Sequence, residues 1–102
     1  MKTASPTTSI VDEVTTWPGI STRKTSRGAT AIVFEGHELG HVHAGRGTLD
    51  LPLSDHRRTE VLKAGRAKEW FSGWVSKSVA GDADAQDAIA LLRESYDELQ
   101  AQ

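Results

Sequence analysis

Short β-prone segments separated by glycine-containing turns run through the middle of the chain, from residue 20 to residue 53. Residues 29–35 (ATAIVFE) are the most strongly β-prone, because Ile32, Val33 and Phe34 follow one another there. Glycines at positions 28, 36, 45 and 47 stand where these segments end. A series of short strands joined by tight turns is typical of an antiparallel meander. The rest of the chain must cover such a sheet, and this requirement limits the fold more than any other feature.

Alternation within the segments predicts which side chains share a face. In residues 38–44, Leu39, His41 and His43 are expected on one face, with Gly40, Val42 and Ala44 on the other. In residues 48–53, Leu49, Leu51 and Leu53 alternate in the same way, and Pro52 indicates a strand end or an edge position.

Helices and a hairpin are expected around the meander. Ser9 suits the N-cap of a short helix that ends at Trp17-Pro18, and Ser54 suits the N-cap of a helix over residues 55–64. Two short strands on either side of residues 71–73 form the hairpin, and a last helix runs from residue 82 to about residue 99. The pattern predicts an α+β domain with a small antiparallel sheet, a meander plus a hairpin, and two or three helices packed on one face. Residues 1–8 are expected to be a disordered tail, and residues 9–102 a single domain.

Composition excludes several classes of function. The chain has 102 residues and no cysteine, which rules out disulfides, thiolate metal sites and a cysteine nucleophile. A formal net charge of −2 argues against bulk attraction to nucleic acid or an anionic membrane. The amino terminus lacks a signal-peptide pattern, and no segment approaches the roughly 18 apolar residues of a membrane span. We therefore expect a cytoplasmic protein without a membrane partner.

Residues 37–41 spell His-Glu-Leu-Gly-His, which fits the H-E-x-x-H pattern of zinc proteases. That chemistry requires a helix, which places both histidines on one face beside the glutamate. Here Gly36 precedes the motif and Gly40 lies inside it, and the flanking residues favour a strand. A regular strand would place Glu38 on the face opposite the histidines, where it cannot act as their base. The sequence therefore argues against a protease.

A second interpretation of these histidines is a metal site on a strand. His37, His41 and His43 would all point to the same side of a regular strand, and neutral imidazoles on one face can converge on an ion such as zinc. Asp50 or His56 would be a further ligand. The alternative is that His41 and His43 are hydrogen-bonded side chains on a core-facing side, with His37 in solvent.

Several motifs together resemble a bacterial family known as the luciferase-like domain or luciferase family, whose function is unknown. They are GHELGHVHAGRGTLDLPL, then GRA, then SGWVS, then ALLRESYDEL. The resemblance as a whole covers most of the chain, from about Trp17 to Leu99. The residues that match the family pattern are Gly40, His41, His43, Asp50, Pro52, Gly65, Arg66, Ala67, Gly73, Trp74, Val75, Ser95 and Tyr96.

The chain departs from that pattern in two places. His37 is not part of it, and members often have a longer loop with histidine and proline between the positions of Arg66 and Trp74. The family name does not imply luciferase activity, because the chain has no flavin fingerprint or nucleotide-binding loop. The last segments also resemble, more weakly, the double-wing fold of MmcQ/YjbR-like proteins, some of which are described as DNA-binding.

These observations lead to a small binding or interaction domain, with no catalytic residue assigned and no cofactor expected. A pocket for a small polar or anionic ligand is expected where five residues converge: His41, His43, Asp50, Arg66 and Trp74. Its partner would be a small ligand or another protein. Two alternatives stay open. One is a histidine-based metal-binding protein. The other is weak DNA binding by basic side chains gathered on one side, namely Arg23, Lys24, Arg27, Arg57, Arg58, Lys63, Arg66 and Lys68.

Overall fold

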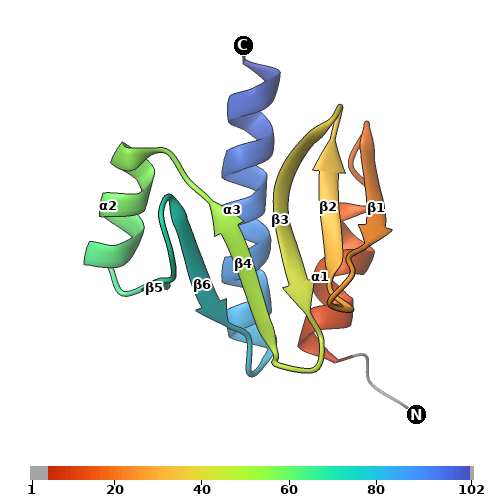
Figure 1. Cartoon of the computed structure of the whole chain (residues 1–102), viewed down its shortest axis with the longest axis horizontal. Coiled ribbons are helices and arrows are strands. Elements are labelled where there is room, and N and C mark those ends of the chain that lie inside the picture. The colour runs from red at the N-terminus through yellow and green to blue at the C-terminus, as the bar shows by residue number, and fades with distance from the viewer. Residues whose placement is uncertain (1–4, 102) are drawn as a thin grey trace.

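The computed structural model describes residues 5–101. Its elements are α1 (Pro6–Val14), β1 (Ile20–Lys24), β2 (Thr30–Phe34), β3 (His37–His43), β4 (Thr48–Pro52), α2 (Asp55–Lys63), β5 (Lys68–Glu69), β6 (Trp74–Ser78) and α3 (Asp82–Gln100) (Figure 1). The strands form one antiparallel sheet in the order β1-β2-β3-β4-β6-β5. The predicted α+β class, with a meander followed by a hairpin, is confirmed. No helix within residues 5–101 is long and apolar enough to cross a membrane.

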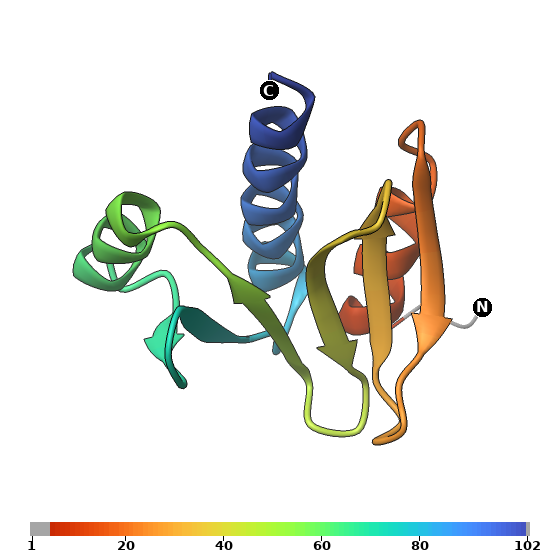
Figure 2. The ribbon, with the colours of Figure 1, turned by 45° about the horizontal axis from the view of Figure 1, so that its top comes forward.

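The helices cover one face of the sheet. In Figures 1 and 2, α1 and α3 lie behind the strands, while the opposite face, called the open face below, has no helix on it. Apolar side chains of the helix-covered face, such as Ile32, Leu49 and Val75, are fully buried against the helices. Complete burial of one such side chain stabilises the fold by about 1.5–3 kcal/mol. The polar residues of the meander are therefore left to the open face.

Tyr96 joins the start of the sheet to α3. Its hydroxyl donates a hydrogen bond to the carbonyl oxygen of Pro18 at 2.6 Å, and its ring lies against Trp17 and Phe34. Ser95 also packs within the helix layer, where its hydroxyl accepts a hydrogen bond from Arg57 at 2.7 Å. Arg57 is buried because it attaches α2 to α3 through Ser95, Glu94, Glu98 and the Leu91 carbonyl oxygen. Arg57 is therefore not available to the surface of basic side chains considered for DNA binding.

The first helix begins earlier than the sequence suggests. Ser5, not Ser9, is its N-cap, and its hydroxyl accepts a hydrogen bond from the Thr8 backbone at 3.2 Å. Pro6 then fits the first turn, where its missing N–H needs no partner. Within the expected disordered tail, residues 5–8 therefore form the cap and first turn, and residues 1–4 lie outside the described residues.

A β-bulge interrupts β3 and changes which side chains share a face. Val33 of β2 pairs with Glu38 and Ile32 pairs with Gly40, so Leu39 is an extra residue in the ladder. Leu39 is only 2% exposed and belongs to the apolar core, so the predicted common face for Leu39, His41 and His43 is wrong. The bulge keeps Leu39 with the helices while His41 and His43 point to the open face. It also moves Glu38 to the same side as His41, contrary to the expectation for a regular strand.

Candidate functional site

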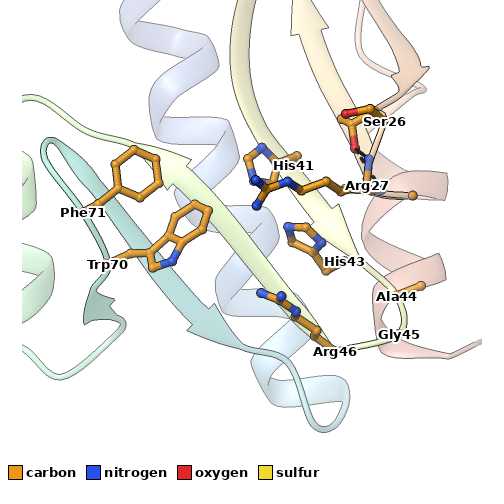
Figure 3. A pocket seen from close by; sticks show the side chains of 12 residues that line it. Ser26, Arg27, His41, His43, Ala44, Gly45, Arg46, Trp70 and Phe71 are labelled. Carbon is orange, nitrogen blue, oxygen red and sulfur yellow. Dashed lines mark hydrogen bonds between the residues drawn. The ribbon is translucent and has the colours of Figure 1, made fainter.

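The open face carries a groove of about 750 Å³ above β3. Three turns and one strand surround it: the β1–β2 turn with Arg27, the β3–β4 turn with Arg46, the β5–β6 turn with Trp70 and Phe71, and β3 with His41 and His43 (Figure 3). The antiparallel register places the β1–β2 and β3–β4 turns at the same end of the sheet. The β5–β6 turn lies at the other end, next to Pro52, and its Trp70 ring reaches His41 over the open face. The groove is thus built from segments up to about 45 residues apart in the chain.

Beneath the groove, His41, His43 and Asp50 form a group that we call the His–Asp cluster. His41 pairs directly with Asp50 across β3 and β4, which explains why the three side chains meet. Oδ2 of Asp50 lies 3.4 Å from Nε2 of His41 and 3.2 Å from Nε2 of His43. Asp50 is only 2% exposed, and within residues 5–101 neither its Oδ1 nor Nε2 of His43 has a hydrogen-bond partner. Burial of a carboxylate with an unsatisfied oxygen is costly unless a cation or a further hydrogen-bond donor compensates it.

Glu38 fixes the orientation of His41. Its Oε2 lies 2.8 Å from Nδ1 of His41, and its Oε1 lies 4.0 Å from Nη2 of Arg23. Because a carboxylate accepts hydrogen bonds, Nδ1 of His41 is the donor in this pair. In the neutral imidazole, Nε2 then keeps its lone pair, and that lone pair faces the His–Asp cluster. The bulge at Leu39 creates this contact by placing Glu38 on the open face.

Aromatic rings form one wall beside the cluster. The rings of Trp70, Phe71 and Trp74 contact one another. Their centroids are 4.3 Å apart for Trp70 and Phe71, 5.7 Å for Phe71 and Trp74, and 6.1 Å for Trp70 and Trp74. The His41 ring lies 5.1 Å from Trp74 and 5.8 Å from Trp70. Trp70 and Phe71 are 39% and 51% exposed, respectively. Large apolar side chains that stay exposed beside a concave polar site are typical of a surface that contacts a ligand or partner.

Two arginines border the groove, one from the β1–β2 turn and one from the β3–β4 turn. Arg27 and Arg46 both line it, and neither has a carboxylate within 4.0 Å among residues 5–101. A guanidinium has five N–H donors in a fixed planar arrangement that suits carboxylate or phosphate oxygens. The electrostatics at the mouth of the groove therefore favour an anion, although the whole chain is slightly acidic.

Comparison with known protein families gives a match that covers most of the residues of this site. The Luciferase domain family matches residues 36–95, which is more than half of the chain. The chain belongs to the Luciferase domain family. No curated protein and no solved structure is significantly similar to it. The resemblance inferred from the sequence motifs is thereby confirmed, whereas the weaker similarity to MmcQ/YjbR-like proteins stays a prediction.

The segment matched by the Luciferase domain family contains the His–Asp cluster, Glu38, Arg46 and the aromatic wall. Arg27 lies outside it, on the β1–β2 turn. Membership assigns no substrate or reaction to these residues. Their chemistry has to be argued from the geometry.

Four of the five residues expected to converge do so in this member of the Luciferase domain family. His41, His43 and Asp50 meet in the cluster, and Trp74 lies against His41. Arg66 does not join them, because it turns to α3 and binds Asp87.

The predicted metal ligands His37 and His56 do not join the cluster either. His37 is exposed at the start of β3, on the face opposite His41 because of the bulge. His56 lies on α2, exposed beside Glu60.

Asp87 is the centre of a second charged group, on the helix-covered side. Nη2 of Arg66 donates to Oδ1 of Asp87 at 2.8 Å, and Nζ of Lys77 lies 2.9 Å from Oδ2. The hydrogen bond to Asp87 is the main cause of the raised pKa of Arg66. Burial raises the pKa of Asp87, but hydrogen bonds from Arg66 and Lys77 outweigh burial and hold that pKa below its usual value. Arg66 and Lys77 are therefore held by Asp87 on the helix-covered side and do not contribute charge to the groove.

The HELGH string forms part of a bulged strand, so it lacks the helical geometry of a zinc protease.

Gly40, inside this string, is required for the packing of β3 against β4. A Cβ at this position would lie 2.8 Å from the Asp50 carbonyl oxygen and 3.0 Å from Cβ of Leu51. Glycine therefore permits the close approach of β3 to β4 that brings Asp50 under the histidines.

Sequence reasoning missed Glu38, Arg27, Arg46, Trp70 and Phe71 as residues of the site. Trp70 and Phe71 are adjacent large apolar residues beside a glycine turn, which is itself a pattern that can mark an exposed aromatic tip. The two arginines stand in turns next to glycine, without a periodic pattern. The predicted basic group is also divided, because Arg57 is buried between helices and Arg66 is bound to Asp87.

Proposed function

We propose that this Luciferase-domain protein is a small-molecule-binding domain that holds a compact organic anion with a flat apolar part. The observation that carries the proposal is the groove of about 750 Å³, in which two arginines without a carboxylate partner among residues 5–101 face an exposed aromatic wall. Small-molecule pockets usually have volumes of about 300–1,000 Å³ and combine an apolar lining with a few polar groups. The groove has this size and this mixture of side chains.

The anionic part of the ligand would lie between Arg27 and Arg46. Each guanidinium can donate two parallel hydrogen bonds to a carboxylate or phosphate, and no carboxylate of residues 5–101 occupies it. The flat part would rest against Trp70 and Phe71, which lose exposed apolar area when covered. His41 and His43 lie at the floor of the groove, beneath the place where the ligand would rest.

Tryptophan signals provide a direct test, because the three tryptophans divide between the two faces. Trp70 and Trp74 belong to the aromatic wall, whereas Trp17 packs against Tyr96 on the helix-covered side. We expect aromatic carboxylates such as salicylate to shift the indole NMR signals of Trp70 and Trp74 saturably and leave Trp17 unchanged. Inorganic phosphate, which lacks the flat part, should bind more weakly.

Arginine variants identify the anion contact. Arg27→Gln combined with Arg46→Gln should weaken binding of the aromatic carboxylate at least tenfold, which is the loss of about one charge-assisted hydrogen bond. The matched control is Arg58→Gln combined with Arg93→Gln, which removes the same charge away from the groove. Equal weakening in both variants, or no saturable shift with any of these anions, would refute the proposal.

A further inference from the structure

We propose that His41, His43 and Asp50 bind one divalent transition-metal ion at the floor of the groove, with the remaining coordination position open to it. The three side chains each offer one ligand atom, and these atoms lie within 4.8 Å of one another. This inference is independent of the organic anion proposed above, because the metal is tested without any organic ligand. It does depend on the geometry of the bulged strand.

Two of the three separations between ligand atoms fit a coordination sphere, and all three atoms lie within 4.8 Å of one another. In a tetrahedral site with bonds of about 2.0–2.1 Å, neighbouring ligand atoms are about 3.3 Å apart. The two separations from Asp50 Oδ2 are 3.4 Å to Nε2 of His41 and 3.2 Å to Nε2 of His43. Neither approach is aligned as a hydrogen bond, and Nε2 of His43 has no hydrogen-bond partner. The nitrogen and oxygen atoms are therefore close together without being hydrogen-bonded. This is the arrangement expected of ligand atoms that bind a common ion.

The buried carboxylate is the second observation. Asp50 is only 2% exposed, its Oδ1 has no hydrogen-bond partner, and no lysine or arginine of residues 5–101 forms an ion pair with it. Leaving such a group without compensation is costly. A divalent ion supplies the missing positive charge, and neutral imidazoles add none. The resulting local charge of about +1 would face the same groove as Arg27 and Arg46.

Glu38 completes the arrangement from outside the coordination sphere. Its hydrogen bond to Nδ1 of His41, at 2.8 Å, leaves Nε2 free to bind the ion. A metal-binding histidine usually donates its other N–H to a carboxylate or carbonyl in this way, which orients the ring and makes it a better ligand. Two imidazoles and one carboxylate suit borderline ions such as Zn²⁺, Co²⁺ and Fe²⁺ better than Ca²⁺ or Mg²⁺.

Calorimetric titration with Zn²⁺ tests the proposal on the full chain, after chelator treatment and removal of any histidine tag. We expect one equivalent to bind with a Kd of micromolar or lower. Co²⁺ in the same protein should give visible absorption bands with the intensity of a four- or five-coordinate nitrogen–oxygen site. It should also quench Trp74, whose ring is 5.1 Å from His41.

Single variants separate this site from surface binding. Asp50→Asn and His43→Ala should each weaken zinc binding at least a hundredfold, and Glu38→Gln about tenfold through His41. His37→Ala and His56→Ala are the controls, because both histidines lie outside the cluster, and these variants should bind zinc as the unaltered chain does. Circular dichroism confirms that each variant is folded.

The metal proposal would be overturned by either of two results. One is a lack of stoichiometric binding below millimolar zinc by the unaltered chain. The other is an affinity that falls as much in His37→Ala as in folded His43→Ala. Neither result would touch the anion proposal, provided that its titrations are also made on chelator-treated protein.

Discussion

Asp50 and Asp87 are both carboxylates at the centre of a charged group, but they lie on opposite sides of the sheet and differ in their compensation. Asp87 has two cationic partners, Arg66 at 2.8 Å and Lys77 at 2.9 Å, although a third of its side chain is exposed. Asp50 is almost fully buried and has only two imidazoles beside it. A carboxylate that serves the fold alone is expected to resemble Asp87. The deficit at Asp50 is therefore the basis for proposing that it binds an ion, and the two carboxylates can be compared experimentally.

The largest loss of stability is expected from a substitution that disrupts the His–Asp cluster without touching Asp87. Gly40→Ala puts a Cβ 2.8 Å from the Asp50 carbonyl oxygen, so β3 and β4 must separate. We expect a loss of about 2–3 kcal/mol in the free energy of unfolding, measured by urea denaturation. Gly45→Ala is the control, because a Cβ there meets nothing within 4 Å. Similar stability of the two variants would show that the close approach of the strands is not needed.

The next largest loss of stability is expected from replacing Asp87 itself. Asp87→Asn leaves Lys77, whose side chain is 8% exposed, without its carboxylate partner. A loss of about 2 kcal/mol in the free energy of unfolding is expected at neutral pH. The exposed Asp97, paired with Arg93 on α3, is the comparison, and Asp97→Asn should cost less than about 1 kcal/mol. If the Asp97 variant lost as much stability, the distinction between the partly buried group and a surface pair would fail.

Acidification should remove the same contribution without a mutation. The pKa of Asp87 is lowered in the folded chain, so its contribution is complete above the unfolded value of about 3.9 and is lost as the pH falls through the folded pKa. The difference in unfolding free energy between the unaltered chain and Asp87→Asn should therefore be constant from pH 7 to about pH 5. It should shrink below about pH 4. A difference that grew on acidification would have the wrong sign for this group.

The smallest effect on stability is expected from replacing Asp50. This variant tests most directly whether Asp50 is less well compensated than Asp87. With a chelator present, Asp50→Asn removes a buried charge that lacks a full partner. The free energy of unfolding should stay the same or rise by up to about 1 kcal/mol. Urea denaturation of this variant beside Asp87→Asn makes the comparison directly. A loss near 2 kcal/mol would mean that Asp50 is compensated as well as Asp87.

Much of the fold could be predicted because it depends on local patterns. Alternation gave the strands, and the apolar spacing of residues such as Ala88, Leu92 and Tyr96 gave α3. Ser54 gave the start of α2, where its side chain accepts a hydrogen bond from the Arg57 backbone. These features require only neighbours along the chain.

The errors arose where distant partners decide the outcome. Arg57 is buried because Ser95 and Glu98 lie on another helix, and Arg66 is drawn away from the groove by Asp87, 21 residues further along the chain. The bulge at Leu39 depends on the pairing with β2, and alternation cannot reveal an extra residue. The predicted convergence of the histidines, Asp50 and Trp74 is found, because β3, β4 and β6 are neighbouring strands. Arg27 and Arg46, which lie in turns, were not predicted to line the same site.

The bulge also affects how this strand should be aligned with those of relatives. Leu39 and Gly40 together face one residue of β2, so a gene lacking the Leu39 codon would keep Glu38, His41 and His43 on the open face. It would lose one core side chain, and the two outer histidines of the HELGH string would be three positions apart instead of four. An alignment gap at this position is therefore compatible with an unchanged site. The spacing that makes the string look like a protease motif is the part that the fold does not require.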